Sequence, residues 1–107
     1  MRLYLPIVGQ SVEDTRDDTL AYIIANGYAE YAAAFLEEYA QTLRRLQRIA
    51  GALPLHRIPM LAERGYREIR FSNHEWYFLY VLEGDTAQVR ILANDKQDIE
   101  ALARRDS

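Results

Sequence analysis

Residues 65–98, GYREIRFSNHEWYFLYVLEGDTAQVRILANDKQD, decide the fold because they contain three successive strand patterns. Residues 66–71 and 86–92 each alternate in polarity, which is typical of strands that have two unlike faces. Residues 76–82 are continuously apolar or aromatic, which indicates a strand covered on both faces or central in a sheet. The link Glu83-Gly84-Asp85 contains the glycine that a tight hairpin needs. We therefore expect an antiparallel meander of three strands.

The alternation also assigns side chains to faces of the expected meander, since neighbours along a strand point to opposite sides. In the first strand, one face takes Arg67, Ile69 and Phe71, and the other takes Tyr66, Glu68 and Arg70. In the third strand, one face takes Ala87, Val89 and Ile91, and the other takes Thr86, Gln88 and Arg90.

The elements on either side of the meander complete an α+β pattern. Residues 1–8 alternate like a strand, but Pro6 cannot donate to a ladder, so this strand should lie at a sheet edge. A turn over 9–14 leads to a helix that Thr15 and Asp18 would cap and that ends at Asn26-Gly27. A longer amphipathic helix follows, from 28 or 29 to 49 or 50, and a loop spans 52–64. Residues 99–105 form a short terminal helix with Asp98 as N-cap.

The predicted fold is thus one α+β domain over 1–107. It has an N-terminal strand, a two-helix hairpin covering one sheet face, a three-stranded antiparallel meander and a short C-terminal helix.

Composition limits the classes of protein to consider. The chain has 107 residues, half of them hydrophobic, which suits one globular core. It has no cysteine, so disulfides, thiolate zinc sites and cysteine nucleophiles are excluded. The longest apolar run, 76–82, is too short to cross a bilayer, and no signal-peptide pattern is present. We expect a cytoplasmic protein that does not bind a membrane.

Charge is distributed unevenly along the chain. The net charge of −3 argues against a general nucleic-acid binder. Residues 1–43 and 71–107 carry net charges of −5 and −3, whereas residues 44–70 carry +5, all of it from arginine. Arginine makes bidentate contacts with carboxylates and phosphates, so this segment is a candidate binding surface, although charge runs are often only solvated helix faces.

The chain resembles the RelE/ParE superfamily of toxins from type II toxin–antitoxin pairs, which includes the plasmid stabilisation proteins. The motifs that carry the resemblance are Gly65 with Arg67, the aromatic run 76–80, Val89-Arg90-Ile91-Leu92 and a late Asp98. The helical hairpin upstream fits the same order. The resemblance implies a toxin that inhibits growth, is neutralised by a cognate antitoxin in a hetero-oligomeric complex and needs no cofactor.

Two mechanisms follow from the two branches of the superfamily. A ParE-like protein would inhibit an essential target without catalysis, in that branch DNA gyrase. A RelE-like protein would cleave mRNA on the ribosome as an endonuclease without a metal ion. A relative that has lost its toxicity is a third possibility. The acidic net charge and an incomplete catalytic set favour the first mechanism.

The candidate catalytic residues apply only to the RelE-like mechanism. Arg70 lies where that branch keeps a phosphate-binding arginine, Arg67 is its neighbour, and His74 and Tyr77 are candidate proton carriers. Several family positions differ: Trp76-Tyr77 replaces a Tyr-Arg pair, and the C-terminal tail has no tyrosine. His56 and His74 are far apart in sequence, so we expect no metal site.

The candidate partner-binding residues are arginines of the basic segment. An acidic antitoxin tail that folds on binding, as a helix or as an extended strand, could neutralise them. They are Arg44, Arg45, Arg48, Arg57 and Arg64.

Overall fold

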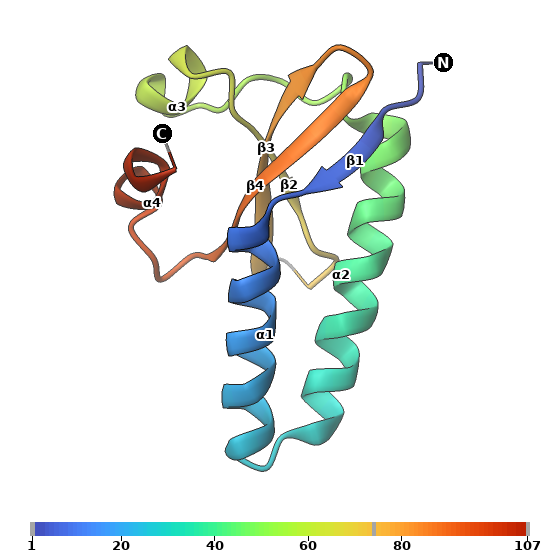
Figure 1. The fold of residues 1–107 in the computed structure, drawn as a ribbon, viewed down its shortest axis with the longest axis vertical. Helices are drawn as coiled ribbons and strands as arrows, with labels where there is room; N and C mark the ends of the chain where they lie inside the picture. The colour runs from blue at the N-terminus through green and yellow to red at the C-terminus, as the bar shows by residue number, and fades with distance from the viewer. Residues whose placement is uncertain (1, 74, 107) are drawn as a thin grey trace.

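A computed structural model describes residues 2–73 and 75–106 and has the α+β architecture expected from the sequence (Figure 1). The elements in chain order are β1 (Leu5–Val8), α1 (Gln10–Ala25), α2 (Ala29–Ile49), α3 (Pro59–Glu63), β2 (Arg67–Arg70), β3 (Trp76–Glu83), β4 (Thr86–Asn94) and α4 (Ile99–Arg105). The predicted fold class is confirmed. Among the described residues, no helix has the length and apolar character needed to span a membrane.

The four strands form one sheet in the order β1-β4-β3-β2. Strands β2, β3 and β4 are antiparallel neighbours, as the meander predicts, and β1 pairs with β4 in parallel. β3 is therefore an inner strand, which explains why its residues are apolar on both faces. β1 lies at an edge, where Pro6 is tolerated.

The hairpin turn and the C-terminal end of α1 each contain a glycine with a positive φ. Gly84 has a φ of +59° in the link between β3 and β4, and Gly27 has a φ of +80° just after α1. Asp98 caps α4 as expected, because its Oδ1 accepts a hydrogen bond of 3.1 Å from the N–H of Ala101.

Two predictions about helix starts and loops were wrong. Helix α1 begins at Gln10 after Gly9, without a side-chain cap, and the hydroxyl of Thr15 donates to the carbonyl of Ser11 inside the helix. The helix begins earlier than predicted. The N–H of Gly9 donates to the carbonyl of Val89, so α1 starts directly after the residue that is still bonded to the sheet. The loop predicted for 52–64 also contains α3, which starts at Pro59.

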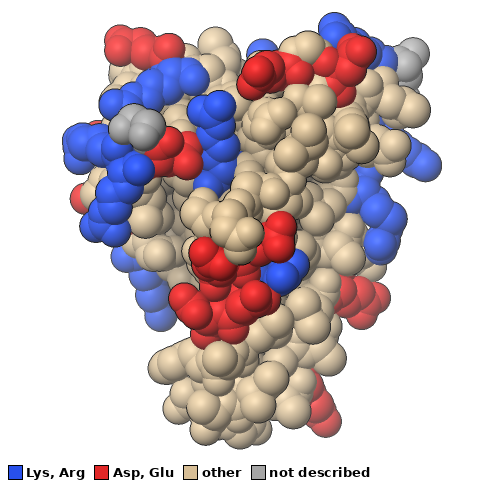
Figure 2. Space-filling model, in the orientation of Figure 1, with Lys and Arg blue, Asp and Glu red and all other residues tan. Residues whose placement is uncertain are grey.

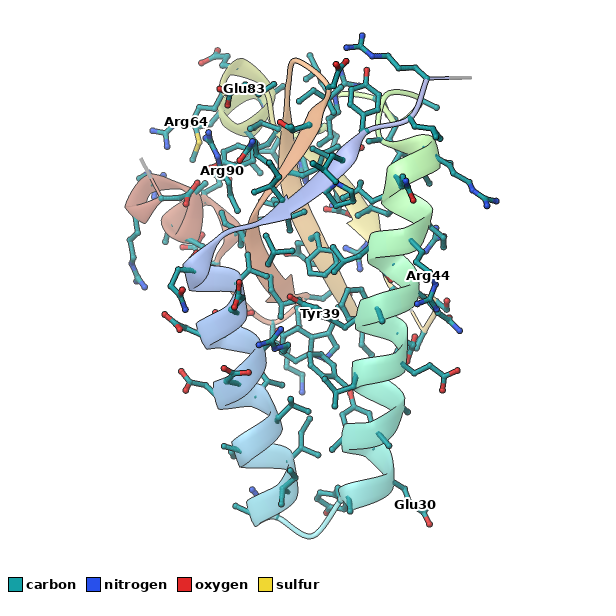
Figure 3. The ribbon with its side chains drawn as sticks, turned by 45° about the vertical axis from the view of Figure 1, so that its right-hand side comes forward. Glu30, Tyr39, Arg44, Arg64, Glu83 and Arg90 are labelled. Carbon is teal, nitrogen blue, oxygen red and sulfur yellow. The ribbon has the colours of Figure 1, made fainter. Side chains whose placement is uncertain are left out.

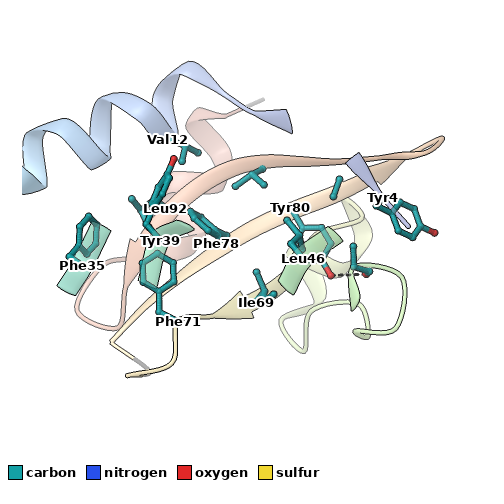
Figure 4. Close-up of a cluster of buried hydrophobic side chains, with 13 residues drawn as sticks. Tyr4, Val12, Phe35, Tyr39, Leu46, Ile69, Phe71, Phe78, Tyr80 and Leu92 are labelled. Atoms are coloured by element: carbon teal, nitrogen blue, oxygen red, sulfur yellow. Dashed lines mark hydrogen bonds between the residues drawn. The ribbon is translucent and has the colours of Figure 1, made fainter. Parts of the chain in front are cut away.

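One face of the sheet packs against the helical hairpin of α1 and α2. This first face holds the larger core cluster, in which aromatic rings meet mostly edge to face (Figure 4). Phe78 lies 5.1 Å from Phe71 and 5.2 Å from Tyr39, measured between ring centroids. The hydroxyl of Tyr80 donates to the carbonyl of Ala50 at 2.7 Å, so the C-terminal end of α2 is fastened to the inner strand β3.

The second face of the sheet packs against the short helices α3 and α4. Leu61 of α3 and Ala103 of α4 are completely buried against Leu79 of β3. The hydroxyl of Tyr66 donates to Asp106 at 2.6 Å. Burial, and then this carboxylate, raises the pKa of Tyr66 to about 12. A polar contact therefore holds the C-terminal helix on this face.

A β-bulge changes which face the residues of β4 occupy. Leu79 pairs with Ile91 and Tyr80 pairs with Val89, so Arg90 is an extra residue in β4. Ala87 and Val89 lie in the first-face cluster, but Ile91 lies in the second-face cluster. The uninterrupted alternation predicted for 86–92 is thus wrong beyond Val89.

Candidate functional site

Arg70, the candidate phosphate-binding arginine, lies at the end of β2 and is held by two carboxylates. Its Nε donates to Oε2 of Glu68 at 2.9 Å. Its Nη2 and Nη1 donate to the two oxygens of Asp95 at 2.7 and 3.1 Å, in a bidentate pair. The guanidinium carbon lies 4.6 Å from the centre of the Tyr77 ring. The side chain thus extends from β2, over a residue of β3, to the loop after β4.

Glu68 connects this arginine to a buried histidine. Its other carboxylate oxygen, Oε1, lies 3.0 Å from Nε2 of His56. Nδ1 of the same ring accepts a hydrogen bond of 3.1 Å from the backbone N–H of Ile58. Because Nδ1 is an acceptor, Nε2 carries the ring hydrogen and donates a hydrogen bond to Oε1 of Glu68. Both oxygens of Glu68 and both ring nitrogens of His56 are therefore engaged.

Two carboxylates, Glu68 and Asp95, meet the Arg70 guanidinium in this cluster, and Arg57 acts on Asp95 as a second, weaker cation. The bond from Arg70 is the main reason why the pKa of the Asp95 carboxyl is lowered, with a smaller contribution from Arg57. Asp95 and Glu68 in turn raise the pKa of Arg70. A phosphate would have to compete with both carboxylates for this guanidinium.

Of the other candidate catalytic residues that the structure describes, Tyr77 lies next to Arg70 and Arg67 lies on the opposite face of the sheet. Tyr77 is only 3% exposed, and burial raises the pKa of its hydroxyl. Arg67 points to the first face of the sheet, as the alternation predicts, and its Nη1 donates to the carbonyl of Leu53. His74 lies outside the described residues.

The candidate partner-binding arginines divide into two groups on opposite faces of the sheet. Arg44 and Arg48 are exposed on α2, and Arg45 donates to the backbone carbonyl of Arg70 at 3.0 Å. Arg57 and Arg64 flank α3, where Arg64 donates to the carbonyl of Ala103 in α4 at 3.0 Å. Figure 3 shows Arg44 on α2 and Arg64 across the sheet from it. Figure 2 likewise shows basic side chains at both sides of the molecule.

The basic segment is therefore continuous in sequence but not in space. On the hairpin, the exposed arginines of α2 are the remaining candidate for a positively charged binding surface.

Sequence reasoning missed three residues of the cluster: His56, Glu68 and Asp95. A signal for Glu68 was present, because the alternation of 66–71 places it on the face of Arg70. His56 and Asp95 lie in loops, and their positions depend on tertiary structure that no local pattern encodes. Among the described residues, no three His, Asp or Glu side chains are grouped so that they could hold a metal ion.

Comparisons with known proteins support the fold. No protein-family model matches the sequence, and no curated protein matches it. A chain in the solved structure of the chromosomal ParDE toxin–antitoxin (TA) system from P. aeruginosa is similar, with a TM-score of 0.69 and 12% sequence identity. The match covers 86% of this chain and 96% of that one. This protein thus has the fold that its resemblance to the RelE/ParE superfamily implies.

Proposed function

We propose that the protein is the toxin of a type II toxin–antitoxin pair and that it acts in the cytoplasm by binding an essential target rather than by cleaving RNA. The similar chain of the ParDE system supports the toxin–antitoxin assignment. The observation that carries the choice of mechanism is the bidentate contact of Asp95 with Arg70, together with the contact from Glu68. An arginine already paired with two carboxylates is poorly suited to stabilising the phosphate charge of a cleavage transition state.

The RelE-like alternative has one observation in its favour. Glu, Arg and His are a residue set that the nuclease branch of the superfamily uses, and here Glu68, Arg70 and His56 are connected. However, His56 is buried and both its ring nitrogens are occupied. A general acid must reach the leaving oxygen of the substrate, so this histidine is badly placed for that role.

The ParE branch acts on DNA gyrase, and gyrase is therefore the target we propose. The exposed arginines of α2 are the candidate contact surface. The antitoxin we propose is the product of the adjoining reading frame, a small protein with a segment that folds on this domain.

The test combines growth, supercoiling and translation assays. Expression alone should arrest growth, and co-expression with the adjoining product should restore it. The purified protein should inhibit supercoiling by gyrase and leave mRNA intact in a reconstituted translation reaction. Arg44→Glu with Arg48→Glu should abolish the arrest, whereas Arg104→Glu with Arg105→Glu, a pair of charge reversals at exposed residues of α4, should not. Codon-positioned cleavage of ribosome-bound mRNA that Arg70→Ala abolishes would place the protein among the nucleases.

A further inference from the structure

A groove opens between the helical hairpin and the sheet, away from the arginines of α2. Its volume is about 620 Å³, within the range of ligand-binding clefts. Its walls come from α1, the start of α2, the start of β3 and the loop after β4. Three aromatic side chains line it: Tyr22, Tyr31 and Trp76. Tyr22 is 71% exposed, so most of its surface is accessible to a partner.

The groove also carries an excess of negative charge. Asp18, Glu75 and Asp95 line it, and Lys96 is the one cationic residue among the described lining residues. Asp18 and Glu75 are the carboxylates that a partner could bind, because Arg70 already pairs with Asp95. The hydroxyl of Tyr31 donates to Oε2 of Glu75 at 2.6 Å, which fixes one ring and one carboxylate relative to each other. Aromatic faces and carboxylates both attract a guanidinium or an ammonium group. The lining is therefore complementary to a cationic side chain.

The apolar surface continues from the groove to the hairpin tip. Ile24 and Tyr28 are exposed there, with 59% and 65% of their surfaces accessible. Figure 2 shows the lower end of the molecule, which the hairpin forms, as mostly uncharged, with acidic side chains gathered above it over α1. An apolar surface next to a carboxylate-lined groove matches a partner segment that is itself amphipathic and basic.

The sheet edges do not favour a partner that binds as an added strand. At β2, the segment before α3 bridges Arg67 through Leu55, and Arg45 occupies the carbonyl of Arg70. At β1, the N–H groups of Leu5 and Gly9 point toward β4, so Pro6, which has no N–H, faces outward. The N–H of Tyr4 already donates to α2. Strand addition depends on free donors and acceptors along an edge.

We propose that a helical segment of the antitoxin docks in this groove and places a Lys or Arg side chain among Tyr22, Trp76 and the carboxylates. The inference rests on the proposed function, because its occupant is the antitoxin. It specifies the conformation of the bound segment and the charge of its central side chain. It also assigns the antitoxin to a surface separate from the arginines of α2.

The test measures the affinity of the purified adjoining product for variants of the groove. Asp18→Lys should weaken binding about tenfold or more, because it places a like charge opposite the cationic side chain. Tyr22→Ala should also weaken binding, since it removes the exposed ring. Glu37→Lys makes the same charge change at an exposed site of α2 outside the groove and should change the affinity by less than about twofold. Circular dichroism checks that each variant is folded.

Charge exchange gives the sharpest result. A partner whose basic residue is changed to Glu should bind the wild type weakly and regain affinity for Asp18→Lys. Equal affinity of wild type, Asp18→Lys and Tyr22→Ala for the partner would overturn the groove assignment and leave the toxin–antitoxin proposal intact. Failure of the partner to bind the wild type at micromolar concentration would overturn both proposals.

Discussion

The two faces of the sheet are built in different ways. The first face is a dry aromatic core under a long hairpin, in which Phe71 and Phe78 are 1% exposed or less. The second face is covered by two short helices and has a polar cluster at its margin, around Arg70. The difference indicates that the first face supplies most of the stability, whereas the second face retains costly polar groups that a purely structural surface would not need.

The largest expected effect on stability comes from removing a large side chain from the core of the first face. Phe78→Ala removes a ring at the centre of the aromatic cluster and should lower the free energy of unfolding by about 3–5 kcal/mol. Leu46→Ala on the first face and Leu79→Ala on the second remove the same side chain from fully buried sites, and Leu79→Ala should cost less. Urea unfolding of the three variants gives the values. A larger loss for Leu79→Ala than for Leu46→Ala would reverse the ranking of the faces.

A smaller effect is expected from breaking the polar cluster. Arg70→Met keeps an unbranched apolar stem over Tyr77 but leaves Glu68 and Asp95 without their cation. Because Glu68 is largely buried, the free energy of unfolding should fall by about 1–3 kcal/mol. Denaturant unfolding measures this loss. Unchanged or higher stability would mean that the cluster contributes nothing to the free energy of unfolding or lowers it.

Removing a single hydroxyl tests how much a hydrogen bond contributes to stability on the first face. Tyr80→Phe removes the hydrogen bond to the carbonyl of Ala50 and should cost about 1 kcal/mol. Tyr77→Phe is the counterpart on the second face and should stay within about 0.5 kcal/mol of the wild type. Thermal unfolding of the two variants under one condition gives the comparison. If Tyr77→Phe proves the more damaging, its hydroxyl has a role in the cluster.

The smallest expected effect is a change in the way stability depends on pH. Arg70 lowers the pKa of Asp95 below its ordinary value of 3.8. Ionised Asp95 therefore stabilises the folded state above that value, and this contribution is lost as the pH falls through the lowered folded-state pKa. Asp95→Asn should reduce stability at pH 7 and make the loss of stability below pH 4 less steep.

The sequence was sufficient to predict elements that depend on local pattern. The alternation in 66–71, the apolar run in β3 and the edge position of β1 were all predicted correctly. The candidate site was predicted less well, because its geometry depends on two loops that meet at the sheet. Asp95 reaches Arg70 only because β4 and β2 flank β3, and no pattern in the chain reports that distance. The bulge at Arg90 was missed for a similar reason, since two residues of β4 oppose one position of β3 only in the assembled sheet.

The parallel pairing of β1 with β4 has a consequence for synthesis of the chain. Leu5 pairs with Thr86, which is made about 80 residues later. Ribosomes add about 5–20 residues per second, so β1 must wait seconds for the strand that completes its pairing. The hairpin of α1 and α2 emerges earlier, with the apolar side that will contact the sheet still uncovered. The sheet can therefore close only after β4 has been made, and a translating ribosome would carry the earlier part of this fold in an unfinished form until that strand emerges.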